Sequence, residues 1–118
     1  MKINEQQRGG IALLSLDGDF IGETDRSDLA ASIQRVLGSG SRRFVIDLRG
    51  VHHINSSGLG SLVSALTTVR RAGGELRLSN ANPDVHHLFE MTQLIKVFEF
   101  HGSVEQALAR YGTAAADT

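Results

Sequence analysis

Cysteine and tryptophan are missing from the sequence, and proline occurs once in its 118 residues. Without thiols there are no disulfide bonds, thiol nucleophiles or cysteine-ligated metal centres, as is typical of proteins in the reducing cytoplasm. Hydrophobic runs are short, and none approaches the roughly 20 residues that a membrane-spanning helix requires. Residues 1–7 lack the apolar segment of a signal peptide. We therefore expect a cytoplasmic protein without a membrane span.

A strong excess of charge is also lacking, because 12 Lys and Arg stand against 13 Asp and Glu. Such a chain has no strong net field to attract nucleic acids or anionic membranes, so direct nucleic-acid binding is not expected. The length suits one domain, since two would each be too small to bury a stable core. We expect this domain at residues 1–112 and a flexible C-terminal tail at residues 113–118, which have little to bury.

Short apolar runs alternate with helical patterns along the chain. The runs predict strands at residues 11–16, 43–48, 75–79 and 97–100. Apolar spacings and capping residues predict helices at residues 24–37 and 57–72, from Asn82-Pro83 onward, and at 103–109. The side chains expected to face inward from the third helix are Val85, Leu88, Phe89 and Met91. Strand 43–48, helix 57–72 and strand 75–79 form a right-handed crossover unit, which predicts an α/β sandwich.

The segment best suited to function is the loop at residues 50–60, because ligands and partners gather where strands of α/β folds lead into helices. It places Asn55, Ser56 and Ser57 at a helix N-terminus, where free N–H groups and the helix dipole can accept an oxygen or a phosphate. Phosphorylation of Ser56 would add up to about −2 of charge there. Ordinary helix capping also explains these residues, so both interpretations remain open. Gly58 and Gly60 are poor helix formers, which indicates a close approach of another backbone.

The hexapeptide Asn55-Ser56-Ser57-Gly58-Leu59-Gly60 follows the strand Phe44–Leu48 and the Gly50-Val51 turn. It resembles the Asp-Ser-Ser-Gly-Leu-Gly signature of STAS domains, in particular that of the bacterial anti-sigma factor antagonists. The likeness extends over about residues 8–110. Its further matches are Arg70–Leu76, Pro83–Thr92, Val97–Phe98 and Ser103–Leu108.

The resemblance implies a STAS-type sandwich, with a mixed sheet of about four to five strands and helices packed mainly on one face. It implies a partner-switching protein and not an enzyme, and it implies no cofactor. Such an antagonist binds an anti-sigma factor that is also a serine kinase, and thereby frees the sigma factor. The kinase phosphorylates the residue matching Ser56, and a phosphatase restores the hydroxyl. The partner-binding residues implied are Asn55, Ser57, Gly58, Leu59, Gly60 and Asp19.

The chain departs from the family pattern at two positions. Asn55 stands where the family has an aspartate, which keeps the shape and loses the charge. Ile21 stands where the family has an acidic residue in an early Gly-Glu-Leu-Asp stretch, and Asp19 supplies an acid nearby. Other family members are scaffolds in signalling complexes or accessory parts of transporters, so an adaptor that is never phosphorylated is the alternative.

Other chemistries find less support in the sequence. His52-His53 and His86-His87 are adjacent pairs, whose side chains point in different directions, so no metal site is expected. A hydrolase triad of Ser56, a histidine and Asp47 would need a Gly-x-Ser-x-Gly elbow, which is absent. The oligomeric state stays open, because an edge strand could pair with a second copy to form a homodimer.

Overall fold

The computed structural model of the protein describes residues 1–116. These residues form five strands, four α-helices and one short 3-10 helix. The elements are β1 (Lys2–Arg8), β2 (Ile11–Asp17), α1 (Glu23–Gly38), β3 (Arg43–Gly50), α2 (Ser56–Arg71), β4 (Glu75–Ser79), α3 (Pro83–Met91), η1 (Leu94–Lys96), β5 (Glu99–His101) and α4 (Val104–Ala116).

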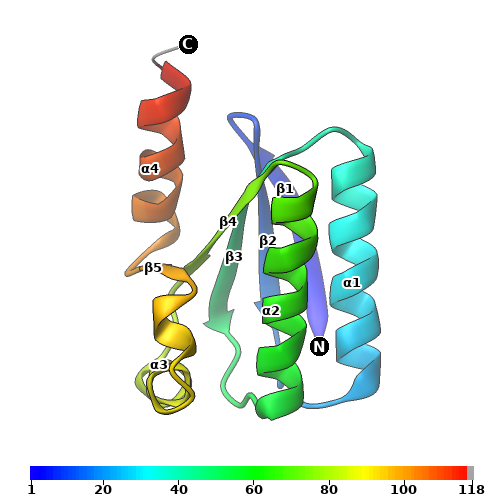
Figure 1. Ribbon diagram of the computed structural model, residues 1–118, viewed down its shortest axis with the longest axis vertical. Coiled ribbons are helices and arrows are strands. Elements are labelled where there is room, and N and C mark those ends of the chain that lie inside the picture. The colour runs from blue at the N-terminus through cyan, green and yellow to red at the C-terminus, as the bar shows by residue number, and fades with distance from the viewer. Residues whose placement is uncertain (117–118) are drawn as a thin grey trace.

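The five strands form one mixed sheet in the order β1-β2-β3-β4-β5 (Figure 1). β1 and β2 form an antiparallel hairpin, whereas β2, β3, β4 and β5 run parallel to one another. The middle strand β3 is buried on both faces, as its nearly continuous apolar run predicted. The expected α/β fold with a mixed sheet is confirmed.

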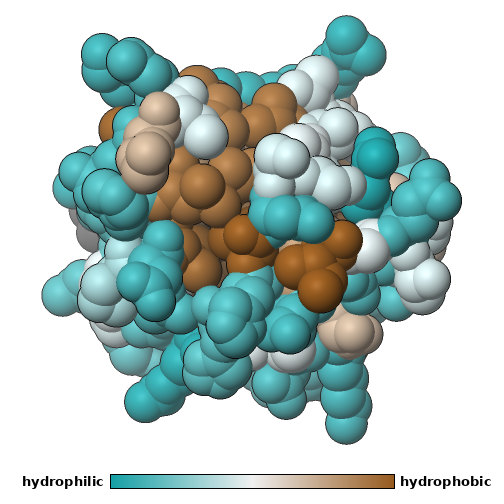
Figure 2. Space-filling model, turned by 90° about the horizontal axis from the view of Figure 1, so that it is seen from below, coloured by the Kyte–Doolittle hydropathy of each residue, from teal (hydrophilic) through white to brown (hydrophobic). Residues whose placement is uncertain are grey.

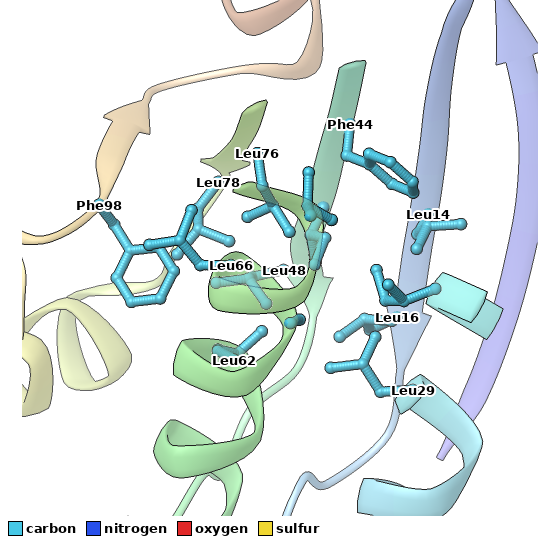
Figure 3. Close-up of a cluster of buried hydrophobic side chains, with 14 of the residues drawn as sticks. Leu14, Leu16, Leu29, Phe44, Leu48, Leu62, Leu66, Leu76, Leu78 and Phe98 are labelled. Atoms are coloured by element: carbon cyan, nitrogen blue, oxygen red, sulfur yellow. The ribbon is translucent and has the colours of Figure 1, made fainter. Parts of the chain in front are cut away.

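Helices cover the two faces of the sheet unequally. The main core lies between the sheet and α1, α2 and α3. Figure 3 shows leucines of α1 and α2 pointing at side chains of the strands. The labelled members of this cluster are Leu14, Leu16, Leu29, Phe44, Leu48, Leu62, Leu66, Leu76, Leu78 and Phe98. On the other face α4 packs alone, where Tyr111 contacts a small cluster and donates a hydrogen bond of 3.1 Å to the Phe44 carbonyl.

Strand β1 was not predicted from the sequence. Its residues are polar and mostly exposed, because β1 is an edge strand, so it lacks the apolar alternation that reveals a strand. The turn that joins β1 to β2 is formed by Gly9 and Gly10, which have φ of +60° and +82°. Two consecutive residues with positive φ are the usual connection of a two-residue hairpin.

Two further expectations need correction. Met91 does not face inward but is 70% exposed, because it lies two residues, or about 200° of helix, beyond the buried Phe89. The closing helix does not end at Ala109 but continues to Ala116. Residues 117–118, the end of the expected tail, lie outside the described residues.

Candidate partner-binding site

The loop that leads into α2 lies beside the segment that leads into α1. The Phe20 N–H donates to the His53 carbonyl at 2.8 Å, and Phe20 pairs with Ile54 in an isolated parallel bridge. Both segments follow strands of the parallel part of the sheet, at the end where α1 and α2 begin (Figure 1). The fold therefore joins two connections, about 34 residues apart in sequence, into one surface.

Asn55 caps α2 and also binds the neighbouring segment. Its Oδ1 accepts the N–H of Gly58 at 2.9 Å, and its Nδ2 donates to the carbonyl oxygen of Ile21 at 3.0 Å. An ionised aspartate could make the first bond, but it has no hydrogen to donate to the second. The Asn55 side-chain amide therefore connects the loop before α2 to the segment before α1, and an aspartate could not do so.

Replacing Asn55 with alanine is expected to lower the free energy of unfolding by about 1 kcal/mol, because the Gly58 N–H loses its cap. Asn55→Asp keeps the cap and places a negative charge at the helix N-terminus, so it should cost less than the alanine variant. Urea denaturation of both variants measures this difference. Equal stability of Asn55→Ala and the wild type would contradict the capping role.

Ser56 is the first residue of α2 and is exposed to solvent. Within residues 1–116, its hydroxyl makes no hydrogen bond that would hold it against the protein. Asn55 and Gly60 are exposed beside it, and Ser57 is half-buried. A Cβ atom at Gly60 would meet nothing within 4 Å, so the expected close approach is absent at this glycine and the surface beside it is open.

Gly58 and Leu59 are both buried beneath this surface, although the resemblance implied that both bind the partner. A Cβ atom at Gly58 would lie 2.4 Å from the Phe20 carbonyl oxygen and 2.7 Å from the Ile54 Cγ1. The close approach indicated by this glycine is real, but the neighbouring backbone belongs to the same chain. Leu59 is 2% exposed and anchors the first turn of α2 in the core.

Asp19 stands on the surface with a partner that the sequence did not reveal. Its Oδ1 lies 3.0 Å from the Nδ1 of His53, three residues before Ser56. Both side chains are well exposed, so the pair contributes little to stability. The pair links the segment that carries Asp19 to the loop that carries Asn55.

The start of α1 is held by Asp25. The helix is capped by Gly22, and the Asp25 carboxylate accepts the N–H groups of Gly22 at 3.0 Å and Ile21 at 3.2 Å. The amino group of Met1 lies 3.1 Å from the same carboxylate. Asp25 therefore stabilises the start of the helix from inside its first turn.

Desolvation raises the pKa of Asp25, but the hydrogen bonds from Gly22, the Met1 amino group and Ile21 together bring this pKa below its ordinary value. A carboxylate with a depressed pKa contributes stability above its unfolded pKa of about 3.9, and this contribution is lost as the pH falls through the folded pKa. Asp25→Asn should therefore be less stable than the wild type at pH 7, and the difference should shrink below about pH 4. Urea denaturation at both pH values measures it, and a pH-independent difference would contradict this account.

The metal and hydrolase interpretations find no matching arrangement among residues 1–116. No group of three or more His, Asp or Glu side chains there could hold a metal ion. The Asp47 carboxylate accepts hydrogen bonds from Asn80 at 2.9 Å and from the Arg49 N–H at 3.0 Å, and not from a histidine near Ser56. Within the same range, no helix combines the length and apolar character needed to cross a membrane.

The chain is similar to anti-sigma factor antagonists of two bacteria. BtrV of Bordetella bronchiseptica, named as an anti-sigma factor antagonist, is 29% identical over 97% of both chains. The anti-sigma F factor antagonist of Paenibacillus polymyxa is 26% identical over 92% of both chains.

Solved structures share the fold at low sequence identity. An anti-sigma factor antagonist of Thermotoga maritima superposes with a TM-score of 0.84 at 18% identity, over 92% of both chains. Phosphorylated SpoIIAA of Bacillus superposes with a TM-score of 0.71 at 16% identity, over 93% of this chain and 99% of the other. A sulfate transporter family protein of Wolinella succinogenes superposes with a TM-score of 0.80 at 18% identity, over 94% of this chain and 91% of the other. The model of the STAS domain matches residues 2–107, and the chain belongs to the STAS domain family.

Proposed function

We propose that this chain is an anti-sigma factor antagonist that acts by partner switching in the cytoplasm. With Ser56 unmodified, it binds a serine-kinase anti-sigma factor and releases the sigma factor that the kinase had sequestered. The kinase then phosphorylates Ser56, the modified chain dissociates, and a phosphatase restores the hydroxyl. In this cycle the chain is a substrate and a competitor, and it catalyses no reaction.

The exposed Ser56 hydroxyl on the first turn of α2 is the observation that carries the proposal. A phosphate here lies near the positive end of the helix dipole, so the folded chain can carry up to about −2 of added charge. A protein docked on the same surface would instead meet new charge and bulk. The names of the two curated relatives, and the existence of a phosphorylated SpoIIAA with this fold, support the same cycle.

The test uses each serine-kinase anti-sigma factor of the organism that encodes this chain, purified and incubated singly with the chain, ATP and magnesium. We expect one kinase to add a single phosphate, and peptide mapping to locate it on Ser56. Ser56→Ala should remain unmodified, whereas Ser57→Ala, a matched change one residue along α2, should still be phosphorylated. Absence of phosphate with every kinase, or its persistence in Ser56→Ala, would contradict the proposal.

A second candidate function is an adaptor that docks through the same loop without modification, in a signalling complex or a transporter. It is favoured by the likeness to a sulfate transporter family protein and by Asn55 in place of the family's aspartate. An unchanged intact mass after the kinase incubations, together with co-purification with membrane transport subunits, would favour it over the antagonist.

A further inference from the structure

Ile21 is an exposed apolar side chain next to the loop that carries Ser56. It is 51% exposed, although isoleucine is among the residues most often buried. Figure 2 shows the end of the molecule where α1 and α2 begin, with hydrophobic side chains gathered inside a hydrophilic surround. This end of the molecule therefore exposes apolar surface.

The backbone of Ile21 is fixed on both sides by hydrogen bonds. Its N–H donates to Asp25 at 3.2 Å, and its carbonyl accepts from the Asn55 side chain at 3.0 Å. The preceding residue, Phe20, is fully buried. Isoleucine is also stiff at χ1 because it is branched at Cβ. Such a residue loses little conformational entropy when a partner covers it.

Ile21 and Ser56 belong to one surface because Asn55 connects them. Asn55 binds the Ile21 carbonyl with one side-chain group, caps α2 with the other, and immediately precedes Ser56. A protein that covers the Ser56 hydroxyl would therefore also contact Ile21.

Polar and charged residues lie on the same two loops as Ile21 and at the adjoining start of α1. The paired Asp19 and His53 lie on the same two loops, and the exposed Glu23 begins α1. An apolar centre within a polar rim is the usual composition of a protein–protein interface.

We propose that Ile21 is the apolar anchor by which the site selects its partner, a protein whose docking surface carries an apolar socket beside the part that receives Ser56. This inference rests on the proposed function, because the partner is the serine-kinase anti-sigma factor. It also gives a reason for the switch. A phosphate on Ser56 would be brought against an apolar contact, where its desolvation is not compensated.

The experiment titrates the kinase that phosphorylates the chain with variants at Ile21, using calorimetry and the non-hydrolysable ATP analogue AMP-PNP to prevent turnover. Ile21→Val and Ile21→Thr have nearly the same shape and differ in polarity. We expect the valine variant to bind within about threefold of the wild type, and the threonine variant about tenfold more weakly. Ile21→Asp should bind at least about a hundredfold more weakly.

Met91→Asp is the matched control, because Met91 is exposed on α3, which lies on the opposite side of α2 from α1 (Figure 1). It should bind like the wild type, and thermal unfolding should show that all variants remain folded. Wild-type affinity of Ile21→Thr and Ile21→Asp, or tighter binding by Ile21→Asp, would overturn the apolar anchor while leaving the proposed function in place. Failure of the wild type to bind any of the kinases would instead contradict the proposed function.

Discussion

The substitution Ser56→Asp is expected to weaken binding to the kinase by about a hundredfold or more, with no loss of the fold. The carboxylate imitates part of the phosphate charge on the exposed first residue of α2. Negative charge is favourable at a helix N-terminus, so the folded chain tolerates it. The partner, by contrast, has to desolvate a charge where it had covered a hydroxyl. Calorimetric titration measures the affinity, and thermal unfolding monitors the fold.

Ser56→Asn is the matched control for this experiment, because asparagine has nearly the size of aspartate and no charge. It should lose far less affinity than Ser56→Asp if charge is the cause. Equal affinity of the wild type and Ser56→Asp would count against the switch. Equally large losses in both variants would show that bulk, and not charge, decides the binding.

Replacing Gly58 with alanine is expected to lower the free energy of unfolding by about 3 kcal/mol, the upper end of the usual effect of overpacking. The added Cβ would stand 2.4 Å from the Phe20 carbonyl oxygen, which is backbone and cannot rotate away. Gly60→Ala adds the same methyl group two residues later, where nothing lies within 4 Å. That change should raise the stability by up to about 1 kcal/mol, because alanine favours the helix.

Urea denaturation of the two glycine variants measures both changes in the free energy of unfolding. Opposite signs of the two changes are the expected result. If Gly58→Ala were as stable as the wild type, the close packing of α2 on the segment before α1 would be wrong.

The sheet and helices could largely be predicted from local pattern. The run Phe44–Leu48 is apolar at nearly every position because β3 is covered on both faces, and α2 shows a regular stripe because one side of it meets the sheet. β1 was not predicted because most side chains of this edge strand are exposed to solvent, so its sequence shows no apolar alternation. Met91 was misplaced because an apolar residue type was given more weight than its angle on the helix.

The candidate site could be located from the sequence but not assembled. Asn55 and Ser56 were recognised from the capping pattern and from the family signature. Their contacts with the segment before α1 join residues about 34 positions apart, which no local pattern reveals. The pairing of Asp19 with His53 and the exposure of Ile21 are therefore properties of the fold. Gly58 was correctly linked to a close approach, but only the structure identified Phe20 as its neighbour.

The most direct test of the switch is displacement of the sigma factor from its complex with the kinase. The complex is formed with fluorescently labelled sigma factor, and the chain is added either unmodified or fully phosphorylated on Ser56. We predict that the unmodified chain lowers the fluorescence anisotropy to the value of free sigma factor, and that the phosphorylated chain leaves it unchanged. Displacement by both forms, or by neither, would contradict partner switching through Ser56.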